Sequence, residues 1–158
     1  MNQPVALAAT DAEDIAELLD QVAMHDGQAV AGGWSANSLA DQLTAKHSQA
    51  WGHRTPETGR LQSMVLIQSI ADMAEILVIA VAPTDRREGL AKELIRHAIG
   101  AVGQSGGKQL DLEVAANNKA AIGLYTTLGF IETGRRPRYY GDVDAVLMQR
   151  RIAETDIA

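Results

Sequence analysis

The sequence contains no cysteine. This absence excludes disulfide bonds, thiolate metal sites and a cysteine nucleophile, so a covalent mechanism would need another residue type. The four histidines, His25, His47, His53 and His97, show no metal-ligand spacing. We therefore expect no metal site and assign the histidines no role.

Long hydrophobic runs are also absent. The longest uninterrupted apolar segment, Ile76 to Ala82, is far shorter than the roughly 20 residues that span a bilayer. The N-terminal segment MNQPVALAATDAED lacks the basic start and apolar middle of a signal peptide. We expect a cytoplasmic protein with no membrane partner.

Positively charged residues are fewer than negatively charged residues. The chain has 14 Lys and Arg residues against 20 Asp and Glu residues, a formal net charge of −6 and a pI near 5.1. A protein that binds nucleic acid generally needs a surplus of Lys and Arg to neutralise phosphates. The balance therefore argues against direct nucleic-acid binding and suits a basic partner.

The N-terminal part of the sequence predicts two helices and a loop. The first helix begins at Thr10, which has Glu13 three residues later as in a capping box. A short second helix runs from Ser35 to about Leu43 with Ser35 as its cap and Trp34 just outside it. Residues 46–60 are polar, contain a proline and two glycines, and are predicted to form a loop or turn.

The central part predicts strands alternating with a helix. Residues 61–70 and 75–81 are rich in Ile, Val, Leu and Met and are separated by a tight connection. The second of these runs is apolar on both faces, which is typical of a central strand. A broad apolar stripe over residues 90–102 predicts a helix, and residues 109–115 predict the next strand. This order implies a right-handed crossover between parallel neighbours.

The C-terminal part predicts a helix from Asn118 to Leu128, which stops at Gly129, and closing strands at residues 130–133 and 145–149. A chain of 158 residues with 46% hydrophobic residues can bury one sizeable core but not two ordinary ones. We expect a single α/β domain over residues 1–158.

The stretch APTDRREGLAKEL, residues 82–94, joins a predicted strand to a predicted helix. Arg86 to Leu90 lie at the helix N-terminus, where backbone N–H groups without intrahelical partners can bind an anion. Gly89 lets the backbone approach a ligand closely, and Ala91 does nearly the same. The stretch contains no GxxxxGK[ST] motif and too few glycines for a dinucleotide fingerprint. By spacing alone, an ordinary turn with solvated charges explains it equally well.

The run RREGLA, residues 86–91, resembles the Gln/Arg-x-x-Gly-x-Gly/Ala signature of the GCN5-related N-acetyltransferases, the GNAT family. It is accompanied, in the order and at the spacing of that family, by ILVIAVAP, LEVAANNKAAIGLYTTLGF and RRPRYYGDVDAVLM. The resemblance is strongest from Glu75 to Gln149 and is greatest to the bacterial ribosomal-protein-alanine N-acetyltransferases. One departure is Ala115, where the family often has arginine.

The resemblance implies the GNAT fold, a mixed central sheet of about six to seven strands flanked by helices, with a splayed pair of parallel strands that holds acetyl-CoA. Acetyl-CoA would be a co-substrate, and no metal is implied. The implied cofactor-binding positions are the strand backbone beside the pantetheine, the turn and helix start around the pyrophosphate, and one asparagine: Ile79, Ala80, Val81, Arg86, Arg87, Glu88, Gly89, Leu90, Ala91, Lys92 and Asn118.

The resemblance also assigns two catalytic residues. An amine must be neutral to attack a thioester, yet an α-amino group has a pKa of about 8, so a base is needed. By resemblance Glu113 is this general base, directly or through a water, and Tyr125 protonates the departing thiolate. From the residues alone, Glu113 is more often a surface carboxylate, and Tyr125 is as often a half-buried ring beneath its helix. The basic and aromatic cluster at residues 135–140 is predicted to be a loop that either shapes the peptide entrance or is simply solvated.

The expected function is direct transfer of acetyl, in a ternary complex, from acetyl-CoA to the N-terminal amine of a protein. By resemblance the acceptor is the N-terminal alanine of a basic small-subunit ribosomal protein, and the enzyme is a monomer or weak dimer. Two alternatives remain open: acetylation of a small-molecule amine or lysine side chain on the same scaffold, and a non-catalytic acyl-CoA-binding sensor.

Overall fold

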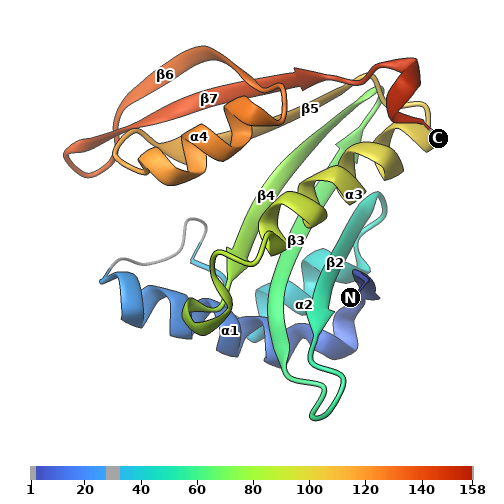
Figure 1. The fold of residues 1–158 in the computed structure, drawn as a ribbon, viewed down its shortest axis with the longest axis vertical. Helices are drawn as coiled ribbons and strands as arrows, with labels where there is room; N and C mark the ends of the chain where they lie inside the picture. Colours follow the sequence, from blue (N-terminus) through green and yellow to red (C-terminus); the bar gives the residue numbers. More distant parts are fainter. Residues whose placement is uncertain (1–2, 28–32, 158) are drawn as a thin grey trace. The chain divides into compact units, whose positions relative to one another are not determined.

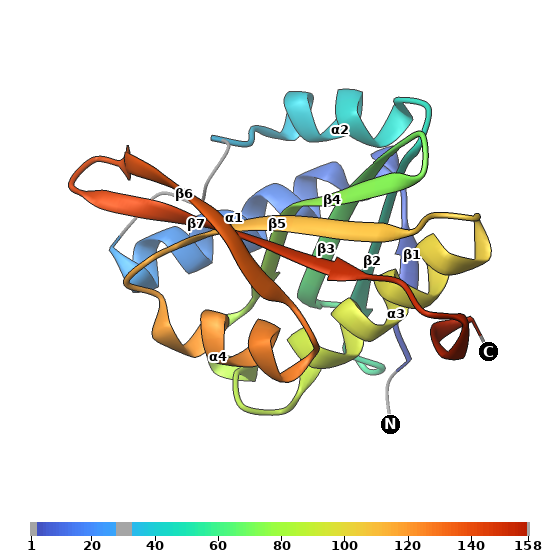
Figure 2. The ribbon, with the colours of Figure 1, turned by 90° about the horizontal axis from the view of Figure 1, so that it is seen from above.

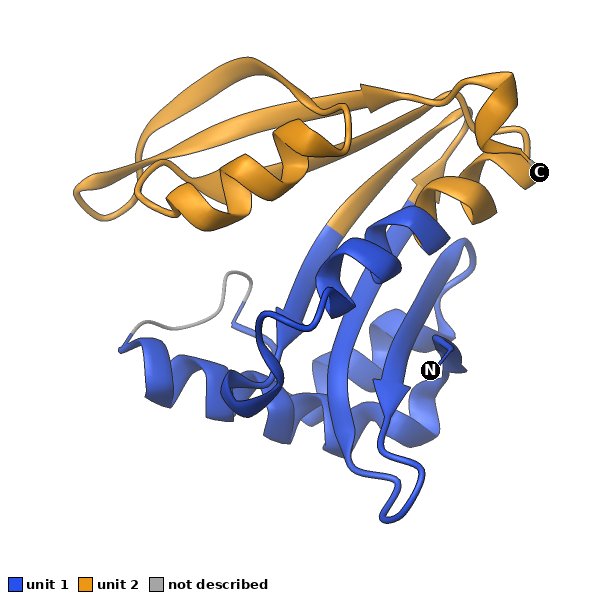
Figure 3. Ribbon diagram, viewed as in Figure 1, with its two compact units in different colours: residues 1–68, 77–97 blue, residues 69–76, 98–158 orange. Residues whose placement is uncertain are grey.

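The computed structural model describes residues 3–27 and 33–157 of the chain (Figure 1). The chain divides into two compact units (Figure 3), of which unit 1 comprises residues 1–68 and 77–97, and unit 2 comprises residues 69–76 and 98–158. The expectation of a single domain over residues 1–158 stays a prediction.

A seven-stranded mixed sheet runs through the described residues in the order β1-β2-β3-β4-β5-β7-β6. The strands are β1 (Val5–Leu7), β2 (Ser48–Arg54), β3 (Leu61–Ile70), β4 (Met73–Val81), β5 (Gln109–Ala115), β6 (Ile131–Tyr140) and β7 (Val143–Arg151). The α-helices in this part of the chain are α1 (Ala12–Asp26), α2 (Ala36–Thr44), α3 (Leu90–Gln104) and α4 (Lys119–Thr127). The predicted mixed α/β fold of six to seven strands flanked by helices is therefore confirmed.

Unit 1 is built around the antiparallel pairs β1–β2 and β2–β3. Helices α1 and α2 lie on one face of β2 and β3, and the first half of α3 lies on the other (Figures 1 and 2). The core between α1, α2 and the strands is one cluster of buried side chains, among them Leu7, Ile15, Leu18, Leu39, Met64, Leu66, Val78 and Ala80. Burial of each large aliphatic side chain contributes roughly 1.5–3 kcal/mol, so this cluster contributes substantially to the stability of unit 1.

The helix starts of unit 1 agree only in part with the sequence pattern. Ser35 caps α2 as predicted, since its Oγ accepts a hydrogen bond from the Ser38 N–H at 3.1 Å. The predicted capping box at Thr10 is wrong, because Asp11 precedes α1 and its carboxylate accepts from the Ala8 N–H at 2.8 Å. A 3-10 turn over residues 9–11 therefore comes before the α-helix.

The predicted loop over residues 46–60 is wrong over most of its length. Residues 48–54 form β2, and only residues 55–60 connect it to β3. The interior of β2 is the run Ala50, Trp51, Gly52 and His53, all of them buried. Glycine and histidine interrupt the hydrophobic alternation, so the pattern did not indicate a strand.

Unit 2 contains the parallel pair that the crossover predicts. Met73–Glu75 of β4 pair in parallel with Gln109–Asp111 of β5. β5 then pairs antiparallel with β7, and β7 with β6. Helix α4 lies along one face of β5 and β7 (Figures 1 and 2).

The predicted loop at residues 135–140 is also wrong. These residues continue β6 to Tyr140, with a register shift between Arg136 and Tyr140 that contains Pro137. β6 is the last strand of the sheet order, and proline is tolerated on such an edge strand because its missing N–H is not needed for a second partner. The strand is almost fully exposed, which explains why its sequence has no hydrophobic alternation.

Gly52 generates a prediction about stability. A Cβ at this position would lie 2.4 Å from the backbone oxygen of Ser63 and 3.0 Å from side chains of Leu61 and Leu7. The oxygen belongs to the paired strand and cannot move cheaply, so Gly52→Ala should lower the free energy of unfolding by about 1–3 kcal/mol. Chemical denaturation measures this loss.

Gly123 in α4 is the matched control, because a Cβ there would meet nothing within 4 Å. Alanine is the better helix former, so Gly123→Ala should raise the free energy of unfolding by about 0.5–1 kcal/mol. Equal stability of Gly52→Ala and the wild type would contradict the close packing of β2 on β3.

Candidate active site

The predicted anion-binding turn lies in unit 1, between β4 and α3. β4 ends at Val81, a 3-10 turn covers Pro83–Asp85, and α3 begins at Leu90 as the sequence predicts. Between them Arg87 has a φ of +66° and Gly89 a φ of +79°. Positive φ is costly for arginine but not for glycine, so the surrounding structure must hold this turn in place.

The backbone of the turn presents N–H groups that the protein itself does not use. In the described part of the chain, none of the N–H groups of residues 86–89 donates to a backbone carbonyl. The first turn of α3 adds further N–H groups without intrahelical acceptors. Successive N–H groups in such a turn form a concavity for an anion, and all four residues are exposed. The geometry fits a phosphate group.

The charged side chains of the turn differ in their partners. Arg86 is bound to Asp26 of α1 through two hydrogen bonds of 3.0 and 3.1 Å. The bonds from Arg86, and then from His25, lower the pKa of Asp26. Among the described residues, Arg87 and Lys92 form no ion pair, so they are the cations of this segment that are available to an anion.

The other cofactor-binding positions predicted in unit 1 are on β4. Ala80 is buried in the core cluster, and Ile79 and Val81 are half-buried. The side chains therefore anchor the strand, and a ligand on these residues would be bound by backbone groups.

Glu113, the predicted base, lies in unit 2 on the polar face of β5. Its neighbours Leu112 and Val114 are buried, while the Glu113 side chain is 21% exposed and pairs with Arg136 at 3.1 Å. β7 lies between the two strands that carry this pair, because Ala145 is opposite both Ala115 of β5 and Arg136 of β6. No sequence pattern indicated this pair, since it depends on the register of β6.

Two further carboxylates share the polar face with Glu113. Glu75 of β4 is the register partner of Asp111 of β5. Desolvation, followed by the nearby charges of Glu113 and Asp111, raises the pKa of Glu75. The face is therefore acidic and has Arg136 as its counter-ion.

The aromatic residues of β6 complete this part of unit 2. Arg136 lies 5.5 Å from the ring centre of Tyr139, and the Tyr139 and Tyr140 rings meet edge to face at 5.1 Å. Burial, then the charge of Glu113, raises the pKa of Tyr140. The cluster that the sequence placed in a loop thus stands on a strand beside Glu113.

Tyr125, the predicted acid, is a buried residue of α4 that is 7% exposed. Its ring packs against Phe130 with 5.8 Å between ring centres. Burial, and to a smaller extent Tyr140, raises the pKa of Tyr125 to about 12. Tyr140 thus interacts electrostatically with both Glu113 and Tyr125. The sequence pattern indicated Tyr140 only as one residue of the cluster at 135–140.

Asn118 has a structural task that the sequence did not assign to it. It is the N-cap of α4, with its Oδ1 accepting from the Ala121 N–H at 3.2 Å. Its predicted contact with a cofactor stays a prediction.

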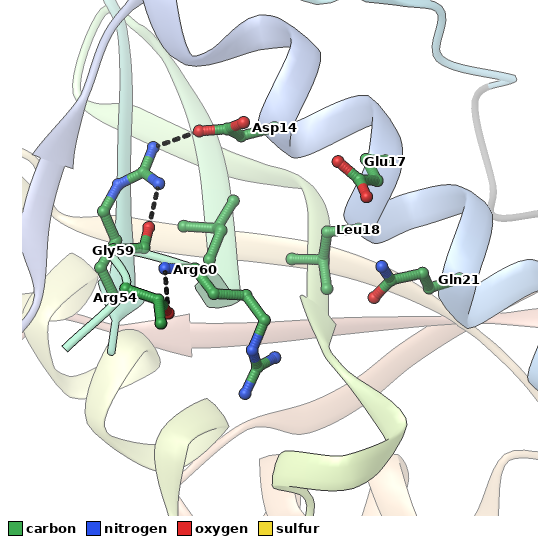
Figure 4. A pocket seen from close by; sticks show the side chains of 9 residues that line it. Asp14, Glu17, Leu18, Gln21, Arg54, Gly59 and Arg60 are labelled. Carbon is green, nitrogen blue, oxygen red and sulfur yellow. Dashed lines mark hydrogen bonds and ion pairs between the residues drawn. The ribbon is translucent and has the colours of Figure 1, made fainter. Parts of the chain in front are cut away.

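A surface hollow in unit 1 contains none of the predicted site residues (Figure 4). It lies between α1 and the β2–β3 connection and measures about 620 Å³ with the solvent space at its mouth. Arg54 at its wall pairs with Asp11 and Asp14.

Two classes of feature are absent from residues 3–27 and 33–157. These residues contain no group of three or more His, Asp or Glu side chains that could hold a metal ion. No helix in this part of the chain is long and apolar enough to cross a membrane.

Comparison with known proteins shows the family of the chain. Residues 15–130 match the model of the acetyltransferase (GNAT) family. The [ribosomal protein bS18]-alanine N-acetyltransferase of Escherichia coli K12 is 34% identical over 119 residues, which are 73% of this chain and 78% of that protein.

Solved structures of acetyltransferases have a fold similar to that of this chain. The crystal structure of the ribosomal-protein-S18-alanine N-acetyltransferase from Escherichia coli superposes with a TM-score of 0.83 at 28% identity, covering 97% of this chain and 95% of that one. The PaiA N-acetyltransferase of Thermoplasma acidophilum, in complex with coenzyme A, superposes with a TM-score of 0.80 at 16% identity over 96% of this chain and 99% of that one. This protein therefore belongs to the GNAT family and is an acetyltransferase.

Proposed function

We propose that the protein is an N-terminal acetyltransferase that moves acetyl from acetyl-CoA directly to the α-amine of a protein, and that its acceptor is the N-terminal alanine of a small-subunit ribosomal protein. One observation carries the choice of acceptor: the 34% identity to an enzyme named for the alanine of ribosomal protein bS18. The acidic polar face around Glu113 agrees with a cationic N-terminus on a basic protein.

The turn before α3 fits the pyrophosphate of acetyl-CoA. Its N–H groups without backbone acceptors, its exposed glycine at positive φ, and the cations Arg87 and Lys92, which form no ion pair within residues 3–27 and 33–157, all suit a pyrophosphate. The full set of residues that would hold the co-substrate is Ile79–Val81, Arg86–Lys92 and Asn118. Acetyl-CoA, when bound, supplies an acetyl group on a thioester.

Glu113 would act as the general base. The acceptor's ammonium must lose a proton before its nitrogen can form a bond to the acetyl carbon, and a carboxylate on a half-exposed face can take that proton directly or through a water. Arg136 holds the carboxylate in place by the 3.1 Å ion pair.

Tyr125 would act as the general acid. When the carbon–sulfur bond breaks, the sulfur leaves as a thiolate that needs a proton. A phenol with its pKa raised to about 12 is fully protonated at neutral pH and can donate to it. Burial of Tyr125 thus favours the donor form.

The acceptor is tested by mass spectrometry of a basic peptide that begins with a free alanine, beside the same peptide with a blocked amine and free lysines. We expect acetyl on the free α-amine only. Glu113→Gln should lower the turnover rate by about 10²–10⁴-fold, the usual contribution of a general base.

Asp111→Asn is the matched control for Glu113→Gln, since Asp111 stands on the same face of the same strand. Its turnover rate should stay within a few-fold of the wild type. Acetyl on the lysines of the blocked peptide, or on small amines alone, would contradict the proposed acceptor. Binding of acetyl-CoA without any transfer would instead indicate a sensor.

The state of Tyr125 is tested through stability at high pH. The folded-state pKa of about 12 lies above the unfolded value of 10. The stabilisation is therefore fully present below pH 10 and is lost as the pH rises through 12. At pH 11 the wild type should have lost about 1.4 kcal/mol on this account, and Tyr125→Phe should not show that loss.

Denaturation curves of both proteins at pH 9 and pH 11 measure this difference. Tyr140 titrates in both proteins and cancels in the comparison. Equal losses in the two proteins would show that Tyr125 is not the buried, protonated phenol.

A further inference from the structure

The β2–β3 hairpin holds the residue that precedes the anion-binding turn. The Asp85 carboxylate accepts hydrogen bonds from Arg60 at 2.9 and 3.3 Å and from Gln62 at 3.1 Å. Asp85 is only 7% exposed, and Thr84 adds a bond of 3.3 Å. Asp85 directly precedes Arg86, so these bonds fix one end of the turn.

The cost of burying Asp85 is offset by these partners. Burial acts to raise the pKa of Asp85, but the hydrogen bonds from Arg60 and Gln62 outweigh it, and the pKa lies below its usual value. A buried carboxylate without such partners would be strongly destabilising. The arrangement is therefore a built network rather than a surface ion pair.

The same hairpin also reaches the other end of the turn. His53 of β2 is 0% exposed, and its Nε2 lies 2.9 Å from Oε2 of Glu93 in the first turn of α3. The Nδ1 of His53 lies 2.6 Å from the Ser63 hydroxyl of β3. The backbone N–H of Glu93 donates to the Gly89 carbonyl at 3.1 Å, so Glu93 is tied to both the hairpin and the turn.

The Ser63–His53–Glu93 chain has the order of a nucleophile, a base and an orienting acid, but it is not a second catalytic site. Ser63 and His53 are both 0% exposed, so no substrate can reach the hydroxyl. A positioning role is what their burial allows.

We propose that Asp85 and Glu93, each bound by the β2–β3 hairpin, are positioning residues that fix the turn at residues 86–89 in its anion-binding form. The proposal rests on the proposed binding of acetyl-CoA by this turn. Among the described residues the N–H groups of the turn make no backbone bonds, so the turn cannot hold its two positive φ angles by itself. The hairpin supplies this rigidity and removes the cost of ordering the loop on binding.

Asp85→Asn tests the proposal, because it keeps the shape of the side chain and removes its charge. Asp14→Asn is the matched control: it breaks the Arg54–Asp14 pair of 2.9 Å, which ties the same hairpin to α1 away from the turn (Figure 4). Titration calorimetry with coenzyme A measures binding without turnover. We expect Asp85→Asn to raise the dissociation constant on the order of tenfold and Asp14→Asn to leave it within about twofold.

Hydrogen exchange of the free proteins gives a second measurement that needs no ligand. The Glu93 amide, which donates to the Gly89 carbonyl of the turn, should exchange faster in Asp85→Asn than in Asp14→Asn. On the other side of the turn, Glu93→Ala should weaken binding of coenzyme A, and Glu93→Gln, which still bonds His53, should restore most of it.

Arg60→Gln repeats the test if Asp85→Asn does not fold, because the Arg60 side chain is 46% exposed and tolerates replacement. Unchanged affinity for coenzyme A in Asp85→Asn or Arg60→Gln, with only the unfolding temperature lowered, would overturn the positioning role alone. A wild-type protein that does not bind coenzyme A would overturn the proposed function and this proposal with it.

Discussion

The proposed binding of an anion requires that the turn leading into α3 keep its backbone N–H groups unused, so other contacts in unit 1 have to hold the shape of the turn. A turn that satisfies its own N–H groups is stable but cannot bind an anion, and a turn that leaves them free has little to hold its shape. Here contacts with other elements of unit 1 hold the shape of the turn. Asp85 is held before the turn, Arg86 is held by Asp26 within it, and Glu93 is held after it.

The two catalytic groups proposed in unit 2 need opposite surroundings. Glu113 has to exchange protons with an incoming amine, and it stands on a polar, half-exposed face with Arg136 as counter-ion. Tyr125 has to keep its proton until it is needed, and it is buried against Phe130. Buried and half-buried side chains alternate along β5, which places Glu113 on the polar face. Tyr125 is the buried residue of α4.

The sequence predicted the elements whose hydrophobic pattern is complete. β4, α3, β5 and α4 are strongly periodic, and the turn between β4 and α3 carries a family signature. β2 was missed, and β6 was predicted only over its first residues, as the strand at 130–133. The reasons are opposite: β2 buries His53 through hydrogen bonds, and β6 is an edge strand with almost no buried face. The residues that bind the carboxylates beside the turn were missed as well. Arg60 lies 25 residues from Asp85 in the sequence, and His53 lies 40 residues from Glu93. Tertiary register determines such pairs, and local pattern does not reveal it.

The two carboxylates next to the turn would be unfavourable for anion binding if they were unpaired. A negative charge within a few ångströms of a phosphate repels it, and the effect is large where water is excluded. Here Arg60 binds Asp85 and His53 binds Glu93, so both carboxylates have partners. For stability alone, apolar side chains at these two positions would serve as well as the partly buried Asp85–Arg60 ion pair, or better. Hydrogen bonds between a carboxylate and a guanidinium are directional, so they hold the backbone at Asp85 in one orientation. The unused N–H groups of the turn need a backbone held in this way to point toward an anion.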